Sequence, residues 1–304
     1  MRLAVSTIAL PQKNQAAWLP KIAEMGFAGV EVSPAWTWGT GCTGPSNAEV
    51  TAFRQSAQQA GLEIVGLHSL LQGQTGMGFF QGSQARQSAV EFVVLMSQVC
   101  RDLGGRTLVL GGERFRGDLD DHSAWAELLN FLEGVLPRIE NHGTLLCLDP
   151  LEPVTADFCH RAADCRMLIG YVDHPALGYQ LDSAVIAANG DAGHTTFAAL
   201  RGKLDVFHVA EPDLLTLGAS QQIDHADFRR HLASISFREW LCLHQQAGAE
   251  PANELESSLR VLRHYYLRRD NLSLERLRQE AAAVKATAQF IPQPIQEKTH
   301  GIRF

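Results

Sequence analysis

Eight short apolar segments alternate with eight longer segments of helical period, and this alternation limits the fold more than any other feature. The short segments are rich in aliphatic residues, as strands buried on both faces are. Eight such units favour a closed (β/α)8 TIM barrel over an open doubly wound sheet. The predicted strands are 3–6, 29–32, 63–67, 107–110, 145–148, 178–181, 206–209 and 240–243, and the predicted helices are 13–25, 47–60, 83–103, 122–140, 157–169, 193–201, 225–234 and 254–268.

Glycine and serine residues mark the ends of these predicted helices. A glycine after a helical stretch indicates a left-handed C-cap, and a serine before one indicates an N-cap. The glycines are Gly26, Gly61, Gly104 and Gly143, and the serines are Ser46 and Ser83. The 304 residues accommodate a barrel of ~250 residues and an extension. We expect a barrel domain over 1–270 and a C-terminal helix and tail over 271–304, either packed on the barrel or partly disordered; a homodimer contact is an alternative.

Composition excludes several classes of function. The formal net charge is −7 and no run of Lys or Arg is present, which argues against nucleic acid as a partner. No segment approaches the ~18 consecutive apolar residues of a membrane span, and the N-terminus has the pattern of a first strand rather than a signal peptide. The six cysteines form no CxxC pair, which indicates buried, reduced thiols. We therefore expect a cytoplasmic protein without a membrane partner.

Polar residues end the last four predicted strands. They are Asp149, Asp182, His208 and His244. In such barrels the chemistry collects where strands end, and a charged group there must be paired, metal-bound or solvated by a cleft. Two carboxylates and two imidazoles suit a borderline divalent cation. A hydrogen-bonded polar cleft without metal is the alternative.

Further polar and aromatic residues follow other strands and are candidates for substrate contacts. Each has a structural alternative, as a salt bridge, a core residue or part of a packed loop. They are Glu31, Trp36, His68, Glu113, Glu152 and Glu211, of which Glu152 and Glu211 are also candidates for orienting metal ligands. Four other histidines, on predicted helices or in the tail, are expected at the surface: His225, His231, His264 and His300.

The same segments resemble the sugar phosphate isomerase/epimerase family of xylose-isomerase-like barrels. The resemblance covers roughly residues 1–268 and rests on the order and spacing of several short motifs. They include Gly26-Phe-Ala-Gly-Val-Glu31-Val, Gly61-Leu-Glu-Ile-Val-Gly-Leu-His68, Asp149-Pro-Leu-Glu152-Pro and Phe207-His208-Val-Ala-Glu211-Pro. It implies one divalent metal ion, such as Mn²⁺, Co²⁺, Zn²⁺ or Mg²⁺, held by Asp149, Asp182, His208 and His244.

Two of these four positions depart from the family pattern. Asp149 and His244 stand where the family has glutamates, and those glutamates are the pair that moves a proton next to a carbonyl. The resemblance thus implies Asp149 and His244 as the catalytic pair of an isomerase or epimerase that acts on a sugar, sugar phosphate or polyhydroxy acid. Val185 and Leu214 replace residues that normally contact substrate hydroxyls, and Arg116 resembles a substrate-anchoring arginine.

Two other functions remain as alternatives at this point. The substitutions at Asp149 and His244 are also compatible with a degraded barrel that binds a sugar-like metabolite as a sensor or accessory protein. A DNA-repair endonuclease shares this kind of barrel, but the acidic net charge and the missing His/Glu cluster of a three-metal site argue against it.

Overall fold

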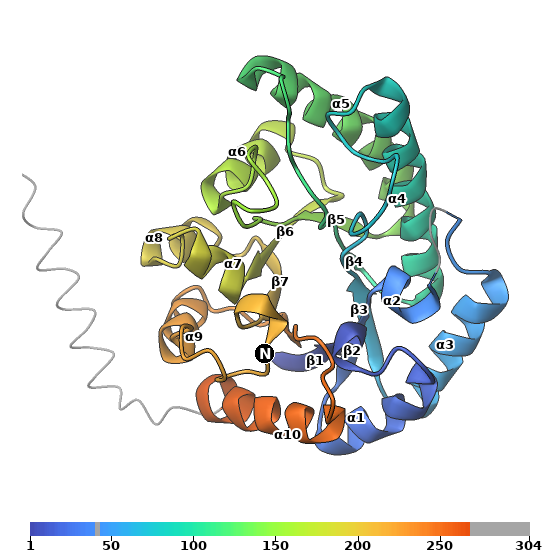
Figure 1. Ribbon diagram of the computed structural model, residues 1–304, viewed down its shortest axis with the longest axis vertical. Helices are drawn as coiled ribbons and strands as arrows, with labels where there is room; N and C mark the ends of the chain where they lie inside the picture. Colours follow the sequence, from blue (N-terminus) through green and yellow to red (C-terminus); the bar gives the residue numbers. More distant parts are fainter. Residues whose placement is uncertain (40–42, 268–304) are drawn as a thin grey trace, which may run out of the picture. The chain divides into compact units, whose positions relative to one another are not determined.

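The chain folds into a closed barrel of eight parallel strands, in the order β1 to β8 around the ring. The computed structural model describes residues 1–39 and 43–267. Figure 1 shows the strands at the centre with the helices around them. The strands are β1 (Arg2–Ser6), β2 (Gly29–Val32), β3 (Glu63–Leu67), β4 (Thr107–Val109), β5 (Leu145–Leu148), β6 (Leu177–Asp182), β7 (Leu204–Val209) and β8 (Trp240–Leu243). All eight predicted strands are confirmed, and their ends differ by two residues at most.

The α-helices lie outside the strands, with two short additions to the predicted set. They are α1 (Leu19–Met25), α2 (Pro34–Trp38), α3 (Asn47–Gln59), α4 (Ser83–Leu103), α5 (Asp121–Ile139), α6 (Ala162–Val172), α7 (Ser183–Ala188), α8 (His194–Ala199), α9 (His225–Ser234) and α10 (Pro251–Leu262). The additions, α2 and α7, directly follow strands β2 and β6. Three of the predicted helices begin or end more than two residues away from the prediction. Residues 13–18 form a turn before α1, and α10 runs into a π-helical turn over Arg263–Leu267.

The predicted helix 157–169 was wrong at its start, because α6 begins only at Ala162. Cys159 takes a left-handed backbone conformation, with φ of 47°, which is incompatible with a right-handed helix. The predicted glycine caps are confirmed, since Gly26, Gly61, Gly104 and Gly143 all have φ between 73° and 102°. Residues 157–161 thus belong to the loop that follows β5.

Two groups of buried apolar residues hold the barrel together. The larger group joins the outer face of the strands to the helices, and α4 and α5 contribute many of its members. The smaller group comes from alternate positions on the strands and fills the inside of the barrel; it consists of Ala4, Val65, Val109, Cys147, Val206 and Cys242. The inside is therefore a packed core and not a channel, as in other barrels of eight strands.

Five of the six cysteines are free and buried, as predicted, and Cys42 lies outside the described residues. The predicted C-terminal helix and tail, 271–304, also lie outside them. No described helix is both long enough and apolar enough to cross a membrane.

Strand β3 carries a glycine whose replacement tests the packing between neighbouring strands. A Cβ at Gly66 would overlap the carbonyl oxygen of Thr107 on β4, and backbone cannot move aside as a side chain does. We expect Gly66→Ala to lower the free energy of unfolding by about 1–3 kcal/mol in urea titrations.

The matched control is Gly170→Ala in α6, where an added Cβ meets no atom within 4 Å. That substitution is expected to be neutral or to stabilise the protein by up to about 1 kcal/mol, because alanine favours the helix. Equal effects of the two substitutions would contradict this view of the β3–β4 contact.

Candidate metal centre and active site

Three side chains from adjacent strands converge at the carboxyl ends of the barrel. Asp182 ends β6, His208 lies on β7 and His244 follows β8, and they offer ligand atoms that all lie within 4.8 Å of one another. The barrel register brings them together, because Asp182 pairs with His208 and β7 in turn pairs with β8. Asp182 Oδ2 lies 2.9 Å from His244 Nδ1 and 3.9 Å from His208 Nδ1. We call this group the three-residue cluster.

The carboxylate of Asp182 is fixed by the helix that follows it. Its Oδ1 accepts hydrogen bonds from the backbone N–H groups of Ala184 and Val185, at 2.8 and 3.3 Å, and so caps α7. Oδ2 is left to face the two imidazoles. Burial alone would raise the pKa of Asp182, but the hydrogen bond and charge of His244, together with His208, lower it. Asp182 is thus ionised and oriented toward the two imidazoles.

A buried glutamate orients His208 from the other side of its ring. Glu31 on β2 is fully buried, and its Oε2 lies 2.8 Å from His208 Nε2. The contact is an ion pair rather than a well-aligned hydrogen bond, because neither atom has a hydrogen bond of good geometry to a described residue. Burial opposes the charge on both groups, yet their mutual attraction lowers the pKa of Glu31 to about 2 and raises that of His208. Glu31 therefore leaves Nδ1 of His208 to face Asp182.

His68 packs against both imidazoles of the cluster. Its ring centroid lies 5.8 Å from that of His208 and 5.2 Å from that of His244, edge to face in each case. Its two nitrogens are within hydrogen-bonding distance of hydroxyl groups, Nε2 at 2.6 Å from Ser6 and Nδ1 at 3.0 Å from Ser69. Burial lowers the pKa of His68 to about 3, so the ring is neutral. It supports the cluster without adding charge.

A cavity of about 400 Å³ adjoins His244. Its wall combines one indole with amide, hydroxyl and aliphatic groups: Ile8, Ser33, Ala35, Trp36, Ser69, Gln72, Leu214, His244 and Gln246. Trp36 is held in place because its Nε1 donates a hydrogen bond to the carbonyl of Leu10 at 3.0 Å. Of the residues predicted to bind substrate, Trp36 is the one that lines this cavity.

Asp149 is not part of the three-residue cluster, because a buried arginine holds it. Arg114 is only 1% exposed, and its Nη2 lies 3.0 Å from Asp149 Oδ1 and also bonds the Asp149 carbonyl. The backbone N–H of Gly111 donates to the same Oδ1 at 3.2 Å. Burial raises the pKa of Asp149, and the charge of Arg114 offsets only part of that effect. The strand-five carboxylate is thus engaged beside the cluster rather than in it.

The other predicted site residues lie in different surroundings. Glu152 is half-buried. Burial raises its pKa, and so do the charges of Asp182 and Asp213, so Glu152 is affected by the charge of the cluster. Glu113 is exposed. Arg116 forms an ion pair with Asp121 and lies over the ring of Phe158 at 6.0 Å, in a separate cavity.

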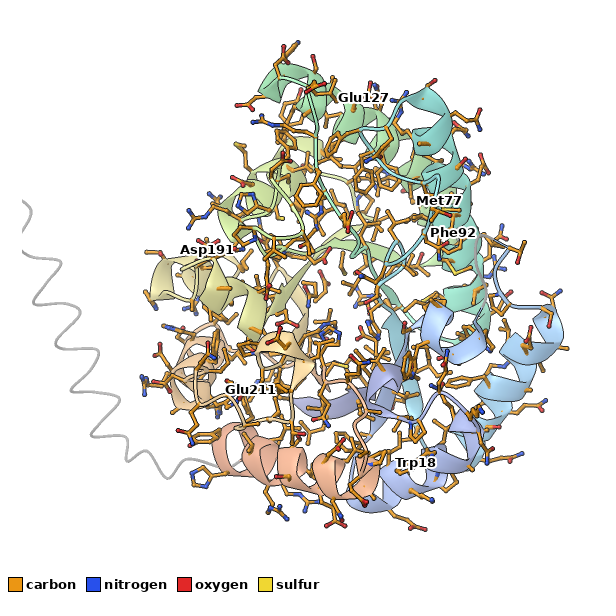
Figure 2. The ribbon with its side chains drawn as sticks, in the orientation of Figure 1. Trp18, Met77, Phe92, Glu127, Asp191 and Glu211 are labelled. Atoms are coloured by element: carbon orange, nitrogen blue, oxygen red, sulfur yellow. The ribbon has the colours of Figure 1, made fainter. Side chains whose placement is uncertain are left out.

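Glu211 belongs to a buried network beneath the loop after β7. It accepts hydrogen bonds from the N–H of Gly218, at 2.7 Å, and from Ser220, and it lies 3.0 Å from His225 Nε2. Figure 2 shows Glu211 on the side of the barrel that α9 covers. The expected surface position of His225 was wrong: it is 4% exposed, because its ring fills the space between Glu211 and the hydroxyl of Tyr266, 3.0 Å from Nδ1.

Several residues of the site were missed in the sequence: the cavity-lining Ser69, Gln72 and Gln246, and two that contact predicted site residues, Ser6 and Arg114. Ser6 ends β1 and contacts His68, and a polar residue at a strand end was the available signal. Arg114 carried no such signal, since it follows β4 by several residues and lies two positions from the more conspicuous Arg116. Its burial depends on a contact between distant loops, where Arg114 and Ala156 form an isolated parallel bridge.

The sequence matches the xylose isomerase-like TIM barrel family over residues 19–265. The chain belongs to this family. None of the curated proteins matches the sequence significantly.

Solved structures of several sugar epimerases share the fold. A D-psicose 3-epimerase crystallised in the presence of D-fructose has a TM-score of 0.74 and 15% identity, covering 87% of this chain and 99% of that one. The D-psicose 3-epimerase of Clostridium cellulolyticum H10, solved with D-tagatose, has a TM-score of 0.70 and 14% identity, with 96% and 99% covered. For 3-keto-D-glucoside 4-epimerase from E. coli the values are 0.72 and 16%, with 87% and 99% covered. At such identities the likeness establishes the fold alone.

We expect removal of the two arginines after β4 to lower the free energy of unfolding by different amounts. Arg114→Met leaves the Asp149 carboxylate buried without its partner, and we expect a loss of about 3–5 kcal/mol in the free energy of unfolding. Arg116→Met breaks a largely exposed pair and is expected to cost about 0–1 kcal/mol. Chemical denaturation of both variants measures the difference.

A second variant separates charge from packing in this test. Arg114→Met combined with Asp149→Leu removes both charges, so stability should recover by most of the loss. If the double variant is as unstable as Arg114→Met alone, the ion pair is not the reason for the loss.

Proposed function

We propose that the protein is a metal-assisted sugar isomerase or epimerase that moves a proton on the carbon next to a carbonyl. The observation that supports this most directly is the three-residue cluster at the carboxyl ends of β6, β7 and β8, beside a cavity whose wall carries hydroxyl and amide groups. Membership in the xylose isomerase-like family and the fold shared with several sugar epimerases agree with it.

The cluster has the donor chemistry of a divalent metal site. Asp182, His208 and His244 present one carboxylate and two imidazoles within a few ångströms, and Glu31 orients His208 as carboxylates commonly orient metal-bound histidines. Two nitrogens and one oxygen favour Zn²⁺, Co²⁺, Fe²⁺ or Mn²⁺ over Mg²⁺, which prefers oxygen ligands. Asp149, the fourth ligand that the family resemblance implied, is bound by Arg114 instead.

A divalent ion at this site would polarise a substrate carbonyl and lower the energy of the negative charge that develops next to it. The chain itself supplies the groups that bind and orient the substrate. Ser69, Gln72 and Gln246 offer hydrogen-bond partners for hydroxyl groups, and Trp36 offers an apolar wall for a carbon skeleton. This combination suits a small polyhydroxy compound.

For the proton transfer we propose Glu152 as a candidate in addition to the predicted pair, Asp149 and His244. Asp149 is held by Arg114, whereas Glu152 has no such partner among the described residues and keeps part of its surface in contact with solvent. The burial and neighbouring charges that raise the pKa of Glu152 also make its carboxyl a better proton donor and acceptor near neutral pH. His244 lines the cavity and is therefore in reach of a substrate bound there.

Metal binding is the first measurable consequence. We expect one Zn²⁺ or Co²⁺ per chain after dialysis, measured by elemental analysis, and tighter binding of these ions than of Mg²⁺. Asp182→Ala should abolish binding because it removes the one carboxylate of the cluster. His194→Ala, at an exposed histidine outside the cluster, is the control and should bind as the parent does. Stoichiometric binding by Asp182→Ala would contradict the proposed site.

The orientation of His208 by Glu31 gives a second, quantitative expectation. Glu31→Gln keeps the size of the side chain but removes its charge, and we expect metal affinity to fall by about 10–100-fold. Glu113→Gln, at an exposed glutamate, is the matched control and should leave the affinity unchanged. Isothermal titration with Co²⁺ measures both. An unchanged affinity in Glu31→Gln would show that Glu31 has only a structural role.

Proton exchange tests the proposed reaction itself. Incubation of the Co²⁺-loaded protein with ketohexoses, ketopentoses and their acids in D₂O should place deuterium on the carbon next to the carbonyl, detected by NMR. Glu152→Gln is expected to slow this exchange by about 10²–10⁴-fold while metal binding is retained. Asp149→Asn is the comparison, and loss of exchange in that variant alone would favour the original pair, Asp149 and His244.

One observation favours a second function, that of a protein that binds a sugar-like metabolite without turnover. Arg114 engages the strand-five carboxylate, which leaves the cluster with fewer acidic groups than the family resemblance implied. In that case calorimetry would detect binding of a sugar in the cavity. No deuterium from the solvent would be incorporated into the sugar, whichever metal ion is supplied.

A further inference from the structure

Two cysteines meet at the start of α6, on the side of Arg114 away from Asp149's carboxylate group. Cys159 lies in the loop after β5, and Cys165 lies in the second turn of the helix; both are buried, at 4% and 0% exposure. The thiol of Cys165 donates to the carbonyl of Cys159 at 3.5 Å, so its sulfur lies against the residue that carries the other thiol. They are free and form no disulfide.

The guanidinium of Arg114 lies against this pair. Its Nη1 donates to the carbonyl of Cys159 at 2.7 Å and lies 3.9 Å from the Sγ of Cys165. Its Nε is buried and has no hydrogen-bond partner among the described residues. A fixed cation beside a thiol stabilises the thiolate, which is the reactive form.

The environment distinguishes Cys159 from the other cysteines that the structure describes, and even the adjacent Cys165 has its pKa raised well above the usual value by the contact with Cys159 and by burial. The neighbouring Cys165 side chain lowers the pKa of the Cys159 thiol, and the charge of Arg114 acts in the same direction against burial. Burial raises the pKa of Cys100 to about 12, and it raises those of Cys147 and Cys242 well above the usual value. Those three thiols are inert by the same criterion.

A cavity gives small molecules access to Cys159. The cavity has a volume of about 580 Å³, and Cys159 forms part of its wall with Trp125, Phe158, His160 and Met167. Met167 is 55% exposed, so the wall extends to the protein surface. The combination of a thiolate-stabilising cation, an adjacent second thiol and an open cavity is typical of a peroxide-sensitive dithiol.

We propose that Cys159 and Cys165 form a redox modification site, in which a peroxide oxidises Cys159 and Cys165 then closes an intramolecular disulfide. The thiolate of Cys159 attacks one peroxide oxygen, so that an S–O bond forms and hydroxide leaves. The thiol of Cys165 attacks the resulting sulfenic sulfur, so that an S–S bond forms and the S–O bond breaks with release of water. Overall two thiols lose two electrons and two protons, and hydrogen peroxide is reduced to two molecules of water.

The cysteine pair is linked to the end of strand β5, because Arg114 contacts both. Arg114 bonds the carbonyl of Cys159 through Nη1 and Asp149 through Nη2. A disulfide pulls Cys159 toward α6 and so alters the position of the guanidinium that holds Asp149. The modification itself does not depend on the proposed enzymatic activity and is tested without it.

The test uses the full chain with Cys42→Ser, so that every remaining cysteine is a described one. The protein is treated with hydrogen peroxide, alkylated with N-ethylmaleimide and digested for mass spectrometry. We expect a mass lower by two hydrogens, a disulfide that joins Cys159 to Cys165, its reversal by dithiothreitol, and reaction of Cys159 at least about tenfold faster than that of Cys100. Cys165→Ala should leave Cys159 as a sulfenic acid that dimedone traps.

Cys100→Ser is the matched control and should form the disulfide as the parent does. If Cys165→Ala fails to fold, the peptide map of the Cys42→Ser parent still shows whether Cys159 and Cys165 form a disulfide. Oxidation of Cys100, Cys147 or Cys242 as fast as that of Cys159, or overoxidation of Cys159 with no bond to Cys165, would overturn the proposal.

Discussion

The pairing of carboxylates with imidazoles inside the carboxyl end of the barrel is the interaction on which the site depends. Charges removed from water are costly unless each has a partner of opposite sign. Glu31 and Asp182 are both buried, and His208 lies between them with one ring nitrogen toward each. The attraction of His208 offsets the cost of burying the charge of Glu31, and His244 and His208 together do so for Asp182. The three groups thus determine one another's charge and orientation.

A second ion pair, between Arg114 and Asp149, gives the two acidic residues at the strand ends different partners. Asp149 is balanced by the guanidinium, whereas Asp182 is balanced by the histidines. A carboxylate that already pairs with a buried arginine gains less from a further cation than one that faces imidazoles, which can themselves bind a metal ion. We therefore expect any cation at this end of the barrel to bind on the side of Asp182. The role of Asp149, the carboxylate after β5, then differs from that of a ligand in the four-residue site that the family resemblance implied.

Much of this could be predicted from the sequence, for identifiable reasons. The eight strands followed from apolar runs of fixed length, and the positions of Asp182, His208 and His244 followed from their places at strand ends, because parallel strands in a closed barrel end at one rim. The start of helix α6 and the surroundings of Arg114 could not be predicted, since they depend on contacts between the loops after β4 and β5. Burial of His225 likewise depends on Tyr266, a residue from the other end of the domain.

The network of Glu211, His225 and Tyr266 has a consequence for the order in which the protein folds. Glu211 follows β7, His225 begins α9, and Tyr266 lies in the last described turn, so the network closes only when the end of the domain has returned to the barrel. Closing this network costs chain entropy, since His225 and Tyr266 are 41 positions apart. During synthesis the network can therefore form only after Tyr266 has been added to the chain. The contacts that hold the loop after β7 are completed by a residue that follows the eighth strand.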